Sequence, residues 1–253
     1  MSADGTPLAG GLPAVSVVIP VHNEAENIPA LADEIGAAMS GRPFEAIFVN
    51  DGSDDGTEAV LKKLGASRPW LRQVKHARSC GQSAAIRSGV RAARAPIVAT
   101  LDGDGQNDPA FLPKLVDALE AAPPPVALVN GRRLQRKGGF KRFQSVIANK
   151  VRATVLRDET LDTGCGLKAF RREVYLALPY FDALHRFTPA LVRREGHDVR
   201  YVDVVDRPRR HGKSHYGMWG RLWVGLLDLY GVYWLVRRRR RVPEVTEIRS
   251  DVR

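Results

Sequence analysis

Two aspartates separated by one glycine follow a short apolar run in the middle of the chain. The run Pro96–Leu101 is followed directly by Asp102-Gly103-Asp104-Gly105-Gln106. Carboxylate and amide oxygens are hard ligands that Mg²⁺ and Mn²⁺ prefer, and such ions commonly share their coordination with substrate phosphates. A solvated Asp/Gly turn would have the same composition. The spacing nevertheless predicts a divalent-cation site in which both carboxylates face one ion.

Two further polar clusters also follow apolar runs. In Asn50–Thr57 (NDGSDDGT) the glycines and hydroxyl residues are typical of a turn that caps the next helix, but a turn does not explain Asp51. At a strand end this carboxylate can accept a hydrogen bond from a base or a ribose. In the other cluster, His22-Asn23-Glu24, the simplest interpretation makes Asn23 a helix N-cap and lets Glu24 favour the helix dipole.

The elements that must position these clusters alternate along the chain. Strands are expected at Ala14–Pro20, Phe44–Val49, Leu71–His76, Pro96–Leu101, Val126–Val129 and Val199–Val205, and helices at Glu26–Met39, Gly56–Gly65, Gln82–Ala93 and Pro109–Leu119. The short gaps predict an α/β fold with a parallel sheet covered on both faces. Such sheets bind ligands at the carboxyl ends of their strands, where the polar clusters fall. The chain has no GxGxxG or GxxxxGK[ST] sequence, so dinucleotide-binding and P-loop functions lose their main support.

Basic residues are concentrated in the second half. Residues 1–131 carry 11 basic and 15 acidic side chains, whereas residues 132–253 carry 28 and 13. Residues 132–157 alone contain nine lysines or arginines and no acid. This asymmetry predicts an anionic partner, such as a phosphorylated ligand, an anionic membrane or a nucleic acid. Nucleic acid is disfavoured, because Phe140 and Phe143 are the only aromatic residues in this segment and no nucleic-acid module is recognisable.

In this order and spacing, the motifs resemble those of family 2 glycosyltransferases with the glycosyltransferase-A fold, a Rossmann-like, mostly parallel sheet. The likeness covers about Val15 to Gly217 and is greatest to the branch of dolichol-phosphate mannosyltransferase and bacterial polyprenyl-phosphate glycosyltransferases. It implies metal-dependent, inverting sugar transfer from a UDP- or GDP-sugar to polyprenyl or dolichyl phosphate. A lipid phosphate is already ionised and needs no base, which agrees with the many cations and the lack of an evident base. A transferase acting on a saccharide hydroxyl is the alternative.

The resemblance also implies roles for individual residues. It assigns the donor to Pro20, Asn23, Glu24, Asp51, Asp102, Arg209, Lys213 and Ser214, and the ion, Mg²⁺ or Mn²⁺, to Asp102, Asp104 and Gln106. It assigns the acceptor phosphate to Arg133, Lys141 or Arg142, and Ser145. The catalytic residues would be Asp104, Asp162 and Arg209. Asp162 opens the turn Asp162–Gly166 near the reaction centre, and we expect it to position groups there rather than act as a base. His215 stands where the family usually has lysine.

The C-terminal part is expected to meet a membrane. Leu222–Val236 is apolar but shorter than the roughly 20 residues that span a bilayer. Three tryptophans, at 219, 223 and 234, lie in or beside it, and five arginines follow at 237–241. This pattern predicts an interfacial helix and polybasic run over residues 218–241, with a buried helix or a true span as alternatives.

The expected organisation is a disordered leader (1–13), a catalytic domain (14–217), the interfacial segment and a disordered tail (242–253). Two cysteines without CxxC spacing fit a reducing compartment. We therefore expect a peripheral or monotopic protein on the cytoplasmic face of the cell membrane. A membrane-protein partner or a homo-oligomer would be compatible with this location.

Overall fold

The computed structural model describes residues 11–134, 152, 155–156, 160, 162–208, 218–238 and 246, with only the backbone for 218–224. The strands are β1 (Val15–Val21), β2 (Phe44–Asp51), β3 (Leu71–His76), β4 (Ile97–Thr100), β5 (Val126–Arg133), β6 (Lys168–Arg171) and β7 (Asp198–Val204). The helices are α1 (Ile28–Met39), α2 (Thr57–Ser67), α3 (Gln82–Ala92), the 3₁₀ helix η1 (Pro109–Phe111), α4 (Leu112–Glu120), α6 (Arg172–Ala177), α7 (Leu184–Arg194) and α8 (Met218–Arg237).

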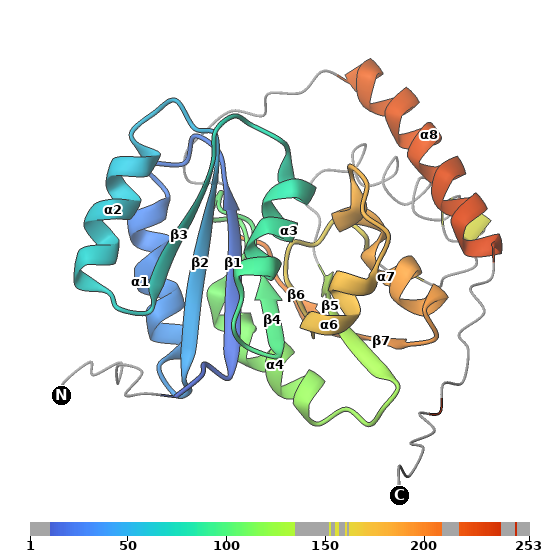
Figure 1. The fold of residues 1–253 in the computed structure, drawn as a ribbon, viewed down its shortest axis with the longest axis horizontal. Coiled ribbons are helices and arrows are strands. Elements are labelled where there is room, and N and C mark those ends of the chain that lie inside the picture. The colour runs from blue at the N-terminus through green and yellow to red at the C-terminus, as the bar shows by residue number, and fades with distance from the viewer. Residues whose placement is uncertain are drawn as a thin grey trace, which may run out of the picture.

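Within the described residues, the strands form one sheet in the order β3-β2-β1-β4-β6-β5-β7 (Figure 1). Neighbours β3, β2, β1 and β4 are parallel, as are β5 and β7. The mostly parallel sheet predicted from the alternating runs is therefore confirmed. Strand β6 is the difference, because it runs antiparallel to both β4 and β5. The chain consequently enters β6 at the edge where the parallel strands end.

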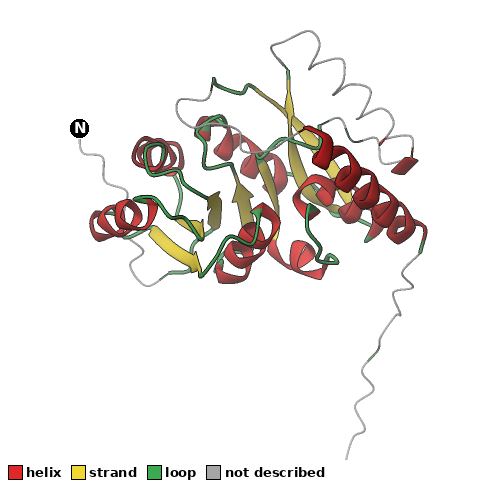
Figure 2. Ribbon diagram, turned by 90° about the horizontal axis from the view of Figure 1, so that it is seen from above, coloured by secondary structure: helices red, strands yellow, loops and turns green. Residues whose placement is uncertain are grey.

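The core has two halves because side chains alternate across a strand. In β1, Val15, Val17 and Ile19 face the cluster made with α1 and α4, whereas Val18 faces the cluster made with α3, α6 and α7. Figure 2 shows the helices on both sides of the sheet. Strands buried on both faces explain the nearly continuous apolar runs in the sequence.

Two local expectations need correction at helix starts. Asn23 is not the N-cap of the first helix, because α1 begins at Ile28 and Asn27 precedes it. Asn23 instead has a left-handed backbone (φ 58°), and its side-chain oxygen accepts a hydrogen bond from the Asp54 amide. It therefore joins the turns that follow β1 and β2. The fourth expected helix is divided, with η1 ahead of α4.

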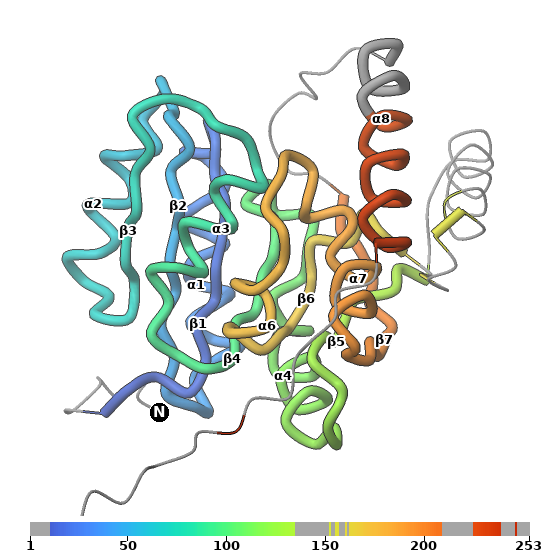
Figure 3. Tube along the Cα trace, turned by 45° about the vertical axis from the view of Figure 1, so that its right-hand side comes forward, coloured from blue at the N-terminus to red at the C-terminus, as the bar shows by residue number. Residues whose placement is uncertain are grey.

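Helix α8 has two sides. Val232 is buried against the cluster of α7, and Arg194 of α7 donates to the carbonyl of Leu235 at 2.8 Å. Figures 1 and 3 show α8 beside the α7 end of the molecule. None of the described helices, α8 included, combines the length and apolar composition that crossing a bilayer requires.

Candidate functional site

The sheet brings the predicted polar clusters to one edge. Strands β1, β2 and β4 are parallel neighbours, so the residues after Val21, Asp51 and Thr100 lie at the same carboxyl edge. The N-terminus of α3 also reaches this edge, where the side-chain amide of Gln82 donates to Asp102 Oδ1 at 2.7 Å. Topology alone therefore assembles a polar site from segments that are far apart in sequence.

The aspartate turn after β4 is tightly built. The amide of Asp102 donates to Asn107 Oδ1 at 3.0 Å, and the amide of Gln106 donates to Asp104 Oδ1 at 3.1 Å. Gly105 has φ +72°, which favours glycine, and a Cβ on Gly103 would lie 2.8 Å from the carbonyl oxygen of Pro20. The two glycines therefore let the turn fold back against β1 while both aspartates stay at the sheet edge.

The electrostatics of this turn favour a cation. Burial, together with the negative charge of Asp104, raises the pKa of Asp102 to about 6. The interacting groups nearby are Asp162, Asp206, Arg133 and Lys168. When all of them are ionised, the four carboxylates and two cations of this described cluster leave two net negative charges. One divalent ion would neutralise the cluster, and the oxygen-rich donor set fits Mg²⁺ or Mn²⁺.

The turn that opens with Asp162 packs directly on the aspartate turn. The hydroxyl of Thr100 donates to the carbonyl of Gly166 at 2.8 Å. A Cβ on Gly166 would lie 2.4 Å from both Asp102 Oδ2 and Asn107 Oδ1, so any other residue here would displace these side chains. The predicted metal motif and the turn predicted to lie near the reaction centre are therefore in direct contact.

Arg133 and Asp162, predicted separately, form an ion pair. The Arg133 guanidinium donates to the two oxygens of Asp162 at 2.7 and 2.8 Å, and to Asp206 at 3.2 Å. Although burial opposes it, these carboxylates raise the pKa of Arg133, which stays charged. Both residues are largely buried, with side chains 13% and 7% exposed. Asp162 is therefore held as an anion against a permanent cation.

Lys168 is a site residue that the sequence analysis missed. It is buried at the start of β6, donates to the carbonyl of Cys165, and interacts with the charges of Asp102 and Asp162. Burial lowers the pKa of its ammonium group. The available signal was one lysine in an otherwise apolar run, Leu167–Phe170. Lysine is rarely buried without a partner, so such a residue indicates a buried anion nearby.

A cavity of about 130 Å³ lies beside the metal motif. Its lining includes Gln82, Asp102, Lys168, Tyr175, His185 and Thr188. The hydroxyl of Tyr175 has no hydrogen-bond partner among the described residues. Burial lowers the pKa of His185 to about 3, so its ring is neutral, and Nδ1 lies 2.8 Å from Ser83 Oγ. One hydroxyl without a partner and one neutral imidazole therefore line a space next to Asp102.

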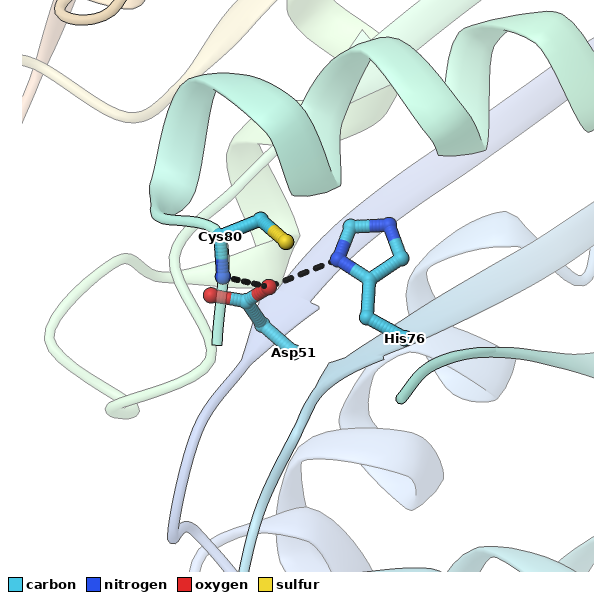
Figure 4. Close-up of side chains that lie close together, drawn as sticks. All are labelled: Asp51, His76 and Cys80. Atoms are coloured by element: carbon cyan, nitrogen blue, oxygen red, sulfur yellow. Dashed lines mark hydrogen bonds and ion pairs between the residues drawn. The ribbon is translucent and has the colours of Figure 1, made fainter. Parts of the chain in front are cut away.

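The residues predicted to bind the nucleotide lie around the ends of β1 and β2. Asp51 is 4% exposed, and its carboxylate accepts from His76, Ser79, Cys80 and Gly81 at 2.6–2.9 Å. Figure 4 shows the hydrogen bonds with His76 and Cys80. Burial alone would raise the pKa of Asp51, but these hydrogen bonds lower it below its usual value. Its contact with a base stays a prediction, since both oxygens already have protein partners.

The other residues predicted to bind the donor or the metal have modest structural roles. Glu24 accepts from the Asn27 side chain at 2.6 Å, and its amide donates to Thr57 Oγ1 at 3.1 Å. Pro20 lies in β1, and the carbonyl of Gln106 accepts from the Arg207 amide at 2.8 Å. Several predicted residues lie outside the described residues, namely Lys141, Arg142, Ser145, Arg209, Lys213 and Ser214.

The fold is shared with known enzymes. The structure superimposes on glucosyl-3-phosphoglycerate synthase of Mycobacterium tuberculosis, solved with Mn²⁺, UDP and phosphoglyceric acid, with a TM-score of 0.67, 21% identity and 90% and 80% of the two chains covered. It also superimposes on a mannosyltransferase of Pyrobaculum calidifontis, solved with GDP-Man and Mn²⁺, with a TM-score of 0.66, 23% identity and 94% and 68% covered. The glycosyltransferase-A fold expected from the motifs is thereby confirmed.

Two proteins related in sequence support the same conclusion. The chain is 34% identical to dodecaprenyl-phosphate galacturonate synthase of Rhizobium johnstonii over 90% of this chain and 68% of that protein. It is 34% identical to undecaprenyl-phosphate 4-deoxy-4-formamido-L-arabinose transferase of Aeromonas hydrophila over 81% of this chain and 63% of that one. The chain thus spans about two thirds of the length of these relatives. The model of glycosyl transferase family 2 matches residues 16–178. The chain therefore belongs to glycosyl transferase family 2.

Proposed function

We propose that this chain transfers a sugar from a UDP- or GDP-sugar to a polyprenyl phosphate at the cytoplasmic face of a membrane, with inversion at the anomeric carbon. The observation that carries the proposal is the direct contact between the Asp102 turn and the Asp162–Gly166 turn. A donor held by the first turn would therefore lie next to an acceptor held by the second. The names of both sequence relatives, which carry a polyprenyl phosphate, support the acceptor.

Asp102 and Asp104 would hold Mg²⁺ or Mn²⁺, with Gln106 beside them, and the bound ion supplies positive charge to the diphosphate leaving group. The net charge of two minus units in the described cluster supports this assignment. The crystal structures of the mycobacterial and archaeal neighbours, which contain Mn²⁺ with UDP or GDP-Man, support it as well. The cavity lined by Lys168, Tyr175 and His185 is the proposed place of the donor sugar.

Arg133 is suited to hold the acceptor phosphate. A guanidinium has five N–H donors, and the three hydrogen bonds to Asp162 and Asp206 leave two for a phosphate oxygen. The ionised phosphate attacks the anomeric carbon without a base, and the diphosphate leaves from the opposite side, which inverts the configuration. Both oxygens of Asp162 accept hydrogen bonds from Arg133. This arrangement supports a positioning role for Asp162 and disfavours a general-base role.

The activity assay separates this function from its alternative. Purified protein, Mn²⁺ and a panel of UDP- and GDP-sugars are incubated with polyprenyl phosphate or with oligosaccharides, and products are identified by mass. We expect a glycosyl polyprenyl phosphate whose mass identifies the sugar. Transfer to the oligosaccharides alone would support the saccharide-hydroxyl alternative and refute the proposed acceptor.

Arg133→Ala tests the acceptor side. A charged, hydrogen-bonded contact contributes about 1.5–3 kcal/mol, so the KM for polyprenyl phosphate is expected to rise about tenfold to a hundredfold. The KM for the nucleotide sugar should change little. Arg132→Ala is the matched control, because Arg132 is half-exposed and pairs with Asp203 on the surface. Equal changes in both Michaelis constants, or equal effects of the two variants, would contradict the assignment.

Helix α8 supports binding to a membrane surface. Leu226, Leu227, Tyr230 and Trp234 are exposed, while Val232 on the same helix is buried against α7. Arg237 and Arg238 lie over the rings of Tyr233 and Trp234 at the end of the helix. An apolar surface next to aromatic residues and arginines is typical of interfacial elements. The exposed side of α8 thus fits the interfacial hypothesis, and its buried side fits the packed-helix hypothesis.

The doubly substituted Leu227→Glu/Tyr230→Glu variant tests this surface. Both side chains are about 70% exposed, so the fold should be retained, while insertion of the helix surface is lost. We expect at least a tenfold weaker association with anionic vesicles in flotation assays. Leu12→Glu, at a residue 78% exposed but far from α8, is the control and should bind as before. Deleting residues 219–253 is a poorer test, since it also removes buried Val232. Unchanged flotation of the double variant would refute the interfacial role.

A further inference from the structure

Asp51, His76 and Cys80 bring three different metal-binding atoms together away from the aspartate turn. A carboxylate oxygen, an imidazole nitrogen and the thiol sulfur all lie within 4.8 Å of one another. Figure 4 shows the three side chains gathered together, with the sulfur of Cys80 pointing toward the ring of His76. Neither the family assignment nor the proposed transfer reaction requires a thiol or an imidazole here.

The backbone sets this arrangement without any ion. Asp51 and His76 are paired residues at the ends of the parallel strands β2 and β3. The loop before α3 brings in Cys80, whose amide donates to Asp51 at 2.8 Å. Gly52 has φ +64°, and a Cβ there would lie 2.3 Å from the backbone of Arg78, so the turn and the loop are in close contact. The three ligating groups are therefore held on packed elements.

The orientation of the His76 ring is also fixed. Its Nε2 lies 2.9 Å from Ser88 Oγ on α3, and its Nδ1 lies 2.6 Å from Asp51 Oδ1. Metal-binding histidines commonly donate their other N–H to such a second partner, which orients the ring and selects the tautomer. Without an ion, Nδ1–H donates to Asp51 and Nε2 accepts from the Ser88 hydroxyl; a cation at Nδ1 requires the other tautomer, in which Nε2–H donates to Ser88. A cation bound by Nδ1 and Oδ1 would replace the hydrogen bond between them.

We propose that Asp51, His76 and Cys80 form a binding site for a thiophilic divalent cation such as Zn²⁺. Sulfur, nitrogen and one carboxylate suit zinc, and three protein ligands leave a fourth position for water or another ligand. Mg²⁺ prefers an all-oxygen set, which the turn of Asp102 and Asp104 offers instead. The two sites therefore differ in ligand chemistry and should select different ions.

Occupation of this site has a consequence that rests on the proposed function. Asp51 is the predicted contact of the donor nucleoside, so an ion bound to its carboxylate competes with that contact. Zn²⁺ at this site would then inhibit transfer by excluding the donor. Inhibition of this kind leaves the ion at Asp102 and Asp104 in place.

Cobalt titration of the full chain tests the site without any assay of activity. Co²⁺ bound to a thiolate gives a charge-transfer absorption in the near ultraviolet. The chain has two cysteines, Cys80, which is exposed, and Cys165, which is buried. We expect the absorption for the unsubstituted protein and for Cys165→Ala, and its loss in Cys80→Ser. Zn²⁺ should displace the cobalt and abolish the absorption.

Two further variants test the rest of the ligand set. Ser88→Ala should weaken cobalt binding about tenfold to a hundredfold, as is typical when a partner of a ligating histidine is removed. Asp104→Asn should leave the absorption intact, because it changes only the oxygen site. No cobalt–thiolate absorption in the unsubstituted protein, or its persistence in Cys80→Ser, would refute the proposal.

Nucleotide binding separates the site from its consequence. Zn²⁺ should weaken binding of the donor nucleotide by the unsubstituted protein, and Cys80→Ser should remove that effect. If cobalt–thiolate absorption forms but Zn²⁺ leaves nucleotide affinity unchanged, the competition with the donor is refuted. Loss of sugar transfer in all assays with normal cobalt binding would contradict the proposed function and not the metal site.

Discussion

Asp104→Ala is expected to abolish sugar transfer. The Asp104 carboxylate is one of the two that would hold the divalent ion, and a bound ion contributes several kcal/mol to stabilising the leaving group. Loss of about 4 kcal/mol corresponds to roughly a thousandfold lower kcat, since each 1.36 kcal/mol is a factor of ten. The measurement is initial rate at saturating donor and acceptor with Mn²⁺ varied. The variant should fold normally, because Asp104 contributes nothing to either core cluster.

The matched control for this substitution is Asp117→Ala. Asp117 lies on α4 and forms a surface ion pair with Arg42, with its own side chain 60% exposed. Surface pairs contribute between zero and about 1 kcal/mol, so activity and melting temperature should be almost unchanged. Full activity in the presence of EDTA, or equal losses in the two variants, would contradict the metal assignment.

Gly166→Ala is expected to have the second largest effect. A Cβ at this position would lie 2.4 Å from Asp102 Oδ2 and from Asn107 Oδ1, far inside contact distance. The Asp102 carboxylate must then move, and misplacing a catalytic group by about 1 Å can reduce the rate a hundredfold. We expect a fall in kcat of at least that size together with weaker Mn²⁺ activation, measured from metal titrations of the rate.

Gly65→Ala provides the matched glycine substitution. Gly65 lies in α2, where an added Cβ would make only ordinary contacts with Leu71, the nearest at 3.7 Å. This variant should retain full activity and gain about 0.4–1 kcal/mol in the free energy of unfolding. A Gly166→Ala protein with normal kcat and normal Mn²⁺ dependence would show that the two turns do not constrain each other.

Much of the sheet could be predicted because its strands are buried on both faces. Phe44–Val49 and Ala14–Pro20 are apolar apart from Glu45 and Ser16, and the observed strands end within two residues of the ends of these runs. The shared edge of the polar clusters follows from the parallel direction alone. Strand β6 was harder to orient, since four residues contain no signal for direction. Its antiparallel pairing depends on contacts with β4 and β5.

The contacts inside the site were the least predictable part. Arg133 and Asp162 are 29 positions apart, and each was predicted from its own motif without reference to the other. Their ion pair exists because β5 and the turn before β6 meet at the sheet edge. Lys168 was missed because a single charged residue in a strand does not form a motif with a recognisable spacing. His76 was missed because its partner, Asp51, lies on a neighbouring strand.

Strand β6 limits which segments of two family members can be joined in one chimaeric protein. Its first residue, Lys168, is paired with Thr100 of β4 on one side and with Asn130 of β5 on the other. The residues that precede β6 form the turn against the aspartate motif. A chimaera that joins β1–β4 of one family member to the remainder of another must therefore match both registers at once. Donor and acceptor preferences in such proteins should therefore change by substitutions within an intact domain, and not by the exchange of whole segments between proteins.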